Sequence, residues 1–233
     1  MIYNIDEVKL KVNEVEKDLG VYIDMNLSSD EHIKVKVKKA NSLMGMIRRT
    51  FHYIDSDTFR LLFSSIIRPH LEYAAPVWNP HLQKHIDMIE NVQRRATKLV
   101  PGLKNLTYKE RLKQVKLPTL KYRRYRGDML EMYKLTHSHY DDSAIKNFIQ
   151  LNQNSHGHQF TVDKQRCNLD VRKFSFKPRV TDQRNNLPDK VVNVESLNCF
   201  KNALDNLWKS SDVIYNADID IQKITSERRV HYL

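Results

Sequence analysis

The 233-residue chain is 40% hydrophobic and 29% charged, a composition typical of a globular protein long enough to bury a core. Its five glycines disfavour a turn-dense β fold and favour helices. The net charge is +11, and residues 30–140 hold 22 Lys and Arg against 10 Asp and Glu, whereas the remainder holds 17 against 18. A basic centre without a long apolar run indicates a nucleic-acid partner rather than a membrane. The alternative is that these cations only solvate helix faces.

Composition also excludes several classes of protein. The two cysteines, Cys167 and Cys199, are too few and too far apart for a disulfide framework or a zinc cluster. The residues after Met1 lack the basic and apolar regions of a signal peptide, and no window approaches the ~20 apolar residues of a membrane span. We therefore expect an intracellular protein, in the nucleus or the cytoplasm.

The first predicted element is a short β-hairpin within residues 1–27. Apolar and charged residues alternate over 8–12 and again over 19–23, with a polar break between them. Two stretches of period two separated by a turn are typical of a hairpin.

Two amphipathic helices are predicted next. Ser28-Ser29-Asp30 is a helix-start signal, and Asp55 or Ser56 is expected to cap the second helix. The lysines at 34, 36, 38 and 39 fall mostly off the apolar stripe of the first helix, which gives it a basic outer face. The apolar positions that define the two helices are Ile33, Val37, Ala40, Leu43 or Met44, and Ile47, then Phe59, Leu62, Phe63, Ile66 and Ile67.

A proline-rich corner follows the second helix. Pro69 interrupts the apolar helical pattern and is expected to bend the helix. Trp78 lies between Pro76 and Pro80, a setting that favours a buried packing anchor whose indole N–H reaches a carbonyl. Pro80 is placed near the first turn of the next helix, predicted from Ile86 to Lys98.

Two further helices are predicted before residue 137. Thr107 and Glu110 fit a capping box, and Pro118 opens a longer helix to about Leu135. Tyrosines and methionines repeat along that helix at helical spacing, a pattern more typical of a core than of base stacking. These residues are Tyr122, Tyr125, Met129, Met132 and Tyr133.

The pattern weakens after residue 137. Residues 138–194 are predicted to be a loop-rich linker with short strands at 160–162 and 173–180, and 195–233 a C-terminal helix over 196–209 followed by a frayed polar tail. The predicted fold is therefore mainly α: a hairpin (1–27), a helical domain (28–137), a linker (138–194) and a C-terminal helix and tail (195–233).

Two stretches carry a resemblance to a known family. The segments RPHLEYAAPVWNP and HIDMIENVQRRATKLVPGLKNLTYKERLKQVKLPTLKYRRYRGDMLEMYKL resemble the region after the polymerase core in reverse transcriptases of LINE-type non-LTR retrotransposons, the jockey-like group. The likeness begins near residues 19–21 and extends, less tightly, to 200–208. It implies that residues 28–137 are a helical thumb and that the hairpin is the remnant of a palm domain.

The resemblance implies that this chain takes part in reverse transcription but does not itself catalyse polymerisation. The family is an RNA-directed DNA polymerase whose magnesium ions are held by carboxylates of the palm, which is absent from this chain. We therefore expect no catalytic residue, no metal site and no cofactor here, and a palm supplied by another polypeptide. The alternatives are a domesticated helical module that binds nucleic acid or protein, and the non-functional product of a decayed element.

Two motifs superficially suggest chemistry. His139-Tyr140-Asp141-Asp142 resembles the aromatic-x-Asp-Asp hairpin of polymerases, but it follows the thumb-like segment and has no flanking apolar strands, so we interpret it as a solvated loop or helix cap. His156-Gly157-His158 lacks a neighbouring Cys or carboxylate at ligand spacing.

A thumb grips a template–primer duplex by its sugar–phosphate backbone without reading sequence. Arginine forks onto phosphate oxygens, and several such contacts make binding strongly salt-dependent. Cations at a helix C-terminus also favour the macrodipole, a structural explanation for part of the set. The candidate contacts to RNA and DNA are Arg48, Arg49, Arg94, Arg95, Lys98, Lys104, Lys121, Arg123, Arg124 and Arg126.

One residue departs from the family pattern. Where related sequences carry Trp-Asn-x-Leu-Pro, this chain has Arg184 in the place of Trp. If that position is a core anchor, the replacement costs roughly 3–5 kcal/mol, as expected of a decaying copy of the element.

Overall fold

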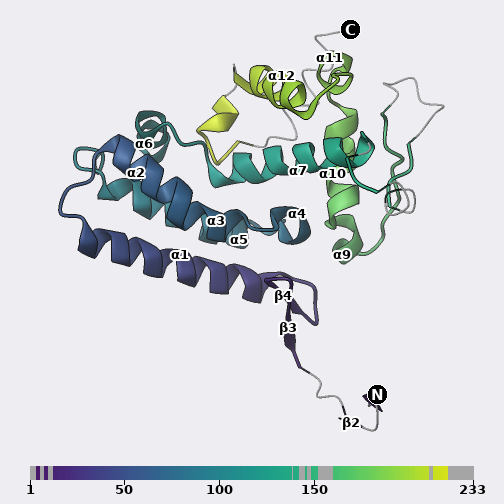
Figure 1. Cartoon of the computed structure of the whole chain (residues 1–233), viewed down its shortest axis with the longest axis horizontal. Helices are drawn as coiled ribbons and strands as arrows, with labels where there is room; N and C mark the ends of the chain where they lie inside the picture. The colour runs from purple at the N-terminus through teal and green to yellow at the C-terminus, as the bar shows by residue number, and fades with distance from the viewer. Residues whose placement is uncertain are drawn as a thin grey trace.

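The computed structural model describes residues 4–5, 8–9, 13–137, 139–141, 145, 148–151, 160–209 and 212–219, and it confirms a mainly helical fold (Figure 1). The principal helices are α1 (Asp30–Thr50), α2 (Ser56–Leu62), α3 (Arg68–Glu72), α4 (Ala75–Trp78), α5 (Gln83–Ala96), α6 (Tyr108–Val115), α7 (Leu120–Thr136), α9 (Asp170–Lys173), α10 (Phe176–Asn185), α11 (Asp189–Val192) and α12 (Leu197–Lys209).

Two small antiparallel ribbons precede α1. They are β1 (Asn4–Ile5) with β2 (Val8–Lys9), and β3 (Val15–Asp18) with β4 (Val21–Asp24). The short β-hairpin predicted within residues 1–27 is therefore confirmed, but the predicted pairing of 8–12 with 19–23 is wrong, because Val8 and Lys9 pair with β1 and β4 pairs with 15–18. Only Val15 is apolar in β3, and the other three β3 side chains are exposed, so this strand carries no alternation signal.

The first hydrophobic core lies among α1, α2, α3, α5 and α6. As predicted, Ile33, Ala40 and Ile47 of α1 are buried, and α1 packs against α3 and α5. Asp55 accepts a hydrogen bond from the Thr58 N–H, and Thr107 forms a complete capping box with Glu110. Local sequence signals thus define the boundaries of these helices.

The proline-rich corner confirms the predicted burial of Trp78, whereas Pro80 lies before the first turn of α5 and not in it. One turn of π-helix, Phe63–Ile67, separates α2 from α3 directly before Pro69. After α3, Trp78 is 3% exposed, and its indole Nε1 donates a 2.7 Å hydrogen bond to the Tyr73 carbonyl. The following helix, α5, begins at Gln83, three residues after Pro80. The corner therefore turns the chain between α3 and α5 around one buried indole.

The second core lies between α7 and the C-terminal helices. The tyrosines and methionines predicted as core on α7 are all buried, together with Trp208 of α12. Arg184 of α10 is also fully buried, with its guanidinium 5.9 Å from the Phe200 ring centroid. Burial lowers the pKa of Arg184 to about 10. The position at which the resembling sequences carry Trp is thus a core position, and in this chain it holds a guanidinium.

Residues 138–194 differ from the predicted linker. They contain α9, α10 and α11, and α10 packs against α7, so the strand predicted at 173–180 is wrong. The inward face of α10 includes Lys177, Thr181 and Gln183 beside Val180, so no apolar period reveals this helix. Of the strand predicted at 160–162, only a single bridge joins Val162 to Leu151. Residues 156–158 lie outside the described part of the chain.

The segment predicted as a frayed tail is partly packed. A 3₁₀ turn spans Asp212–Ile214 with Val213 buried, and the Thr119 N–H donates a 2.9 Å hydrogen bond to the Ile214 carbonyl. The remainder of the tail, from residue 220, lies outside the described residues.

Candidate nucleic-acid interface

The candidate interface is built on the parallel pair α1 and α5. At the start of both helices, His85 Nε2 lies 2.8 Å from Asp30 Oδ1. Farther along, Arg95 Nη2 donates a 2.8 Å hydrogen bond to Asn41 Oδ1. Because these two contacts follow each other in the same direction, the C-terminal ends of α1 and α5 lie at the same end of the molecule.

Exposed cations follow the outer side of this pair. On α1, Lys34, Lys38 and Arg49 are four and eleven residues apart, and Arg48 adjoins Arg49. Lys84 and Arg95 of α5, and Lys98 in the 3₁₀ turn that follows α5, are eleven and three residues apart. These spacings are close to whole helical turns, so each set lies along one face of its helix. We call this surface the α1–α5 basic face, and its exposed members are Lys34, Lys38, Arg48, Arg49, Lys84, Arg95 and Lys98.

Among the residues that the structure describes, six of the seven cations of this face form no ion pair. Lys34 Nζ lies 2.5 Å from Asp30, and Asp87 accepts from the Gln83 amide. Arg48, Arg49 and Arg95 lie in the last turns of their helices, where they also favour the macrodipole. The face therefore carries net positive charge in solvent, which is what contact with a polyanion requires.

Two other predicted cations lie near the end of α5. Lys104 is exposed in the loop before α6. Arg94 contacts other segments: its guanidinium carbon lies 5.0 Å from the Tyr108 ring centroid, and Nη2 is 3.8 Å from Asp218 Oδ1. Arg94 therefore packs against α6 rather than joining the basic face.

The predicted cations of α7 have intramolecular partners. Lys121 Nζ donates to the carbonyls of Ala217 and Ile219, 2.9 Å each. Arg124 is 3% exposed, and its Nε donates to Asn79 Oδ1 at 3.2 Å. Because of these contacts, neither side chain is placed to contact the sugar–phosphate backbone of a nucleic acid.

The remaining two α7 arginines form forked ion pairs. Both Nε and Nη2 of Arg123 bond to the Glu72 carboxylate, and the same atoms of Arg126 bond to Asp205 at 2.6 and 2.7 Å. The predicted nucleic-acid contacts therefore do not form one surface. Four of them lie on α7 and not on the α1–α5 basic face: Lys121, Arg123, Arg124 and Arg126.

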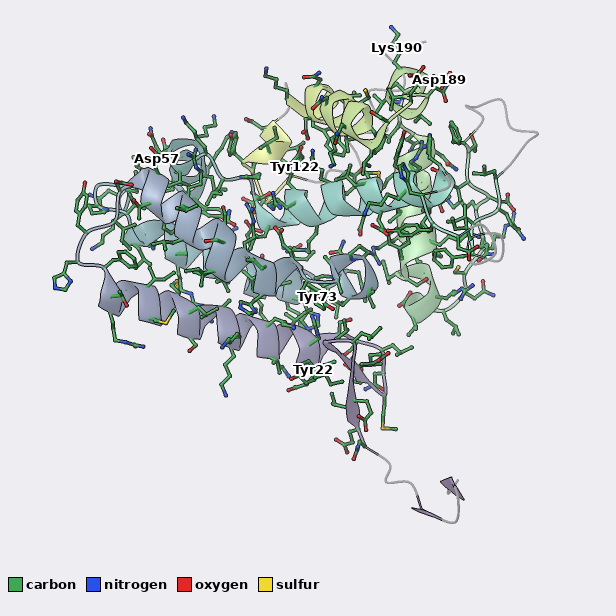
Figure 2. All side chains as sticks on the ribbon, in the orientation of Figure 1. Tyr22, Asp57, Tyr73, Tyr122, Asp189 and Lys190 are labelled. Atoms are coloured by element: carbon green, nitrogen blue, oxygen red, sulfur yellow. The ribbon has the colours of Figure 1, made fainter. Side chains whose placement is uncertain are left out.

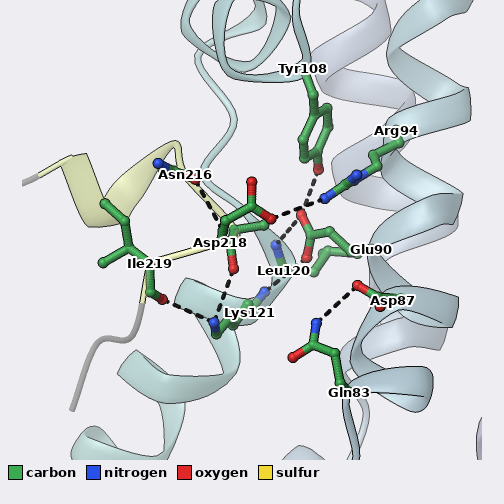
Figure 3. A network of polar contacts seen from close by, with 11 residues as sticks. Gln83, Asp87, Glu90, Arg94, Tyr108, Leu120, Lys121, Asn216, Asp218 and Ile219 are labelled. Carbon is green, nitrogen blue, oxygen red and sulfur yellow. Dashed lines mark hydrogen bonds and ion pairs between the residues drawn. The ribbon is translucent and has the colours of Figure 1, made fainter. Parts of the chain in front are cut away.

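A buried carboxylate fixes α5 to the helices behind it (Figure 3). Glu90 is 1% exposed and accepts from the Tyr108 hydroxyl at 2.5 Å and from the N–H groups of Leu120 and Lys121 at 3.2 and 3.1 Å. It thus satisfies free donors in the first turn of α7. Burial and the adjacent Glu90 carboxylate raise the pKa of Tyr108, so the hydroxyl stays a donor.

The sequence prediction missed Lys84 altogether. The signal was present, because Lys84, Arg95 and Lys98 recur at helical spacing around the exposed Asn91. The lysines of α1 were predicted to be an outer face but were not included among the contacts. The prediction selected adjacent charges such as Arg48-Arg49 and Arg94-Arg95, whereas Lys84 stands eleven residues before Arg95 with no neighbouring Lys or Arg.

Two other features, a metal-ligand cluster and a membrane-spanning helix, are absent from the residues that the structure describes. Within them, no three His, Cys, Asp or Glu side chains converge as metal ligands, and no helix has both the length and the apolar character of a membrane span. In the Asp-Asp motif, Tyr140 donates a hydrogen bond to Glu131, whereas Asp142 lies outside the described residues.

Comparisons with known proteins add one relative. The uncharacterized protein B0403.1 of Caenorhabditis elegans is 23% identical to the chain over 136 residues, covering 56% of this chain and 69% of that protein. No family model matches the chain, and no solved structure matches it.

Proposed function

We propose that the chain is the thumb and C-terminal part of a LINE-type reverse transcriptase, which grips template–primer nucleic acid and lacks the catalytic palm. The observation that carries the proposal is the α1–α5 basic face, with its seven exposed cations. The quoted family motifs supply the polymerase context. The palm, which would hold the magnesium ions, is not among these 233 residues.

The dimensions of the face suit a duplex backbone. Lys34 and Arg49 are fifteen residues apart on α1, which corresponds to about 22 Å at the helical rise. One strand of a duplex presents a phosphate about every 3.4 Å, so the face spans roughly six phosphates. Its contacts would be to backbone oxygens, and binding would not depend on sequence.

The test is fluorescence anisotropy of a labelled RNA–DNA hybrid over a range of salt concentrations. The variant carries Gln at five face positions: Lys38, Arg48, Arg49, Arg95 and Lys98. Its affinity should fall, and the slope of log K against log salt should flatten by about four. Two hybrids of unrelated sequence should bind equally.

A matched control removes the same charge elsewhere. Five other exposed cations are replaced by Gln: Arg166, Arg172, Lys173, Lys190 and Lys209. Figure 2 shows Lys190 on α11 pointing away from the body. Equal losses in the two variants would contradict a dedicated face. Primer extension with nucleotides and magnesium should give no product, and any product would contradict the absence of a palm.

A further inference from the structure

A second basic feature is a groove along α7. It has a volume of about 470 Å³ and is lined by α3, α4, α7 and α12, with no residue from α1 or α5. Five of its lining side chains are Lys or Arg, and two are Glu. The groove is therefore positively charged and separate from the α1–α5 basic face.

Three of the five cations in the groove are already neutralised. Arg123 is paired with Glu72, Arg126 with Asp205, and Lys134 Nζ lies 3.0 Å from Glu131. These pairs leave Arg124 and Lys201 as the lining cations that form no ion pair within the described residues.

Arg124 is the most deeply buried residue of the groove lining, with 3% exposure. Its Nε bonds to a neutral amide, Asn79 Oδ1, while its Nη1 has no hydrogen-bond partner among the described residues. The nearby Asp128 carboxylate accepts from Arg179 and Asn79 instead. Burial lowers the pKa of Arg124. A buried guanidinium lacking a directly bonded carboxylate is costly, and a bound anion would offset that cost.

Lys201 enters the groove from α12. It is half-buried, and its Nζ reaches only Asn198 Oδ1, at 3.5 Å. Within the described ranges it has no ion pair. The rest of the groove wall includes the apolar side chains of Pro76, Leu130 and Leu197. Two cations without carboxylate partners thus share the groove with an apolar surface.

We propose that this groove binds a phosphate monoester of mononucleotide size, with Arg124 and Lys201 holding the phosphate and the apolar wall covering the organic part. Arginine and lysine are the usual phosphate donors, and the volume lies in the range of small-molecule sites. The site does not depend on the proposed grip on nucleic acid.

The test is isothermal titration calorimetry of the full chain with adenosine 5′-monophosphate, inorganic phosphate and adenosine. The monophosphate should bind with a Kd below about 1 mM, and adenosine should not bind. Phosphate that binds as tightly as the monophosphate would support the two cations and overturn the role of the apolar wall. Absence of binding by both phosphates at about 10 mM would overturn the site.

Two substitutions on α12 test whether the monophosphate binds in the groove. Lys201→Gln should weaken monophosphate binding about tenfold, whereas Lys209→Gln, which removes an exposed lysine of α12 outside the groove, should leave it unchanged. Equal effects of the two variants would overturn the assignment. The five-Gln variant of the α1–α5 basic face should retain monophosphate binding while losing the hybrid, which separates the two proposals. Loss of both in that variant would overturn the independent groove site.

Discussion

Arg179 on α10 forks onto the carboxylate of Asp128 on α7. Its Nη2 donates to Asp128 Oδ1 at 3.0 Å and its Nε to Oδ2 at 3.2 Å. Asn79 donates to the same carboxylate at 2.8 Å, and Arg179 also donates to the Pro76 carbonyl at 2.8 Å. One buried ion pair therefore joins the proline-rich corner, the long helix α7 and the segment predicted to be a linker.

Asp128→Asn should destabilise the protein by about 3–5 kcal/mol, because it leaves the Arg179 charge buried without its partner. Burial raises the pKa of Asp128 more than Arg179 lowers it. The predicted loss of stability therefore comes from leaving one charge buried without its partner. Urea denaturation provides the measurement. Asp205→Asn is the control: that carboxylate is 48% exposed, so its loss should cost about 1 kcal/mol or less. Equal costs would contradict the role of burial.

Glu90→Gln should lower the free energy of unfolding by about 1–3 kcal/mol. The substitution removes one acceptor from a buried group that receives hydrogen bonds from Tyr108, Leu120 and Lys121. Asp87→Asn, on the same helix, should change stability by about 0.5 kcal/mol or less, because the hydrogen bond that Asp87 accepts from Gln83 is exposed. Thermal unfolding of the two variants distinguishes these outcomes.

Stability should fall as the pH drops from about 6.5 to about 4. His32 is fully buried and accepts a hydrogen bond from the Tyr22 N–H at Nδ1. Burial, with Lys36 nearby, lowers the pKa of His32 to about 4. The unfolded chain therefore binds a proton in this range that the folded protein does not, and up to about 3 kcal/mol is lost as the pH falls.

Denaturation with urea at pH 7.5 and pH 4.5 checks the His32 prediction. The pH dependence should be weaker in His32→Gln than in the parent protein, whereas His52→Gln, at an exposed position, should keep it. An unchanged pH dependence in His32→Gln would show that other groups cause it.

Gly20→Ala should cost more than Gly102→Ala. The two glycines have nearly equal φ, +83° and +82°, so each substitution incurs the left-handed strain of about 1 kcal/mol. Only at Gly20 would the added Cβ meet a neighbour, Tyr73 Cε1 at 3.1 Å. The difference in melting temperature between the two variants measures that contact, and equal shifts would mean that the Tyr73 ring moves aside freely.

The environments of the basic residues could not be predicted from the local sequence pattern. A basic helix face reads the same in sequence whether it meets solvent or carboxylates from another segment. Glu72 and Asp205 lie 51 and 79 residues from the α7 arginines that they pair with. No spacing rule over one or two turns detects a partner at that separation.

The sequence by itself determined the features whose causes lie within a few residues. These are the caps at Asp55 and Thr107, the interruption before Pro69, the burial of Trp78 and the apolar stripes of α1 and α7. The tertiary structure alone decided that α10 is a helix, since its inward face holds Arg184 and other polar side chains. It also decided which cations remain in solvent. Helix formation depends on neighbours along the chain, whereas the state of a charge depends on which distant segment packs against it.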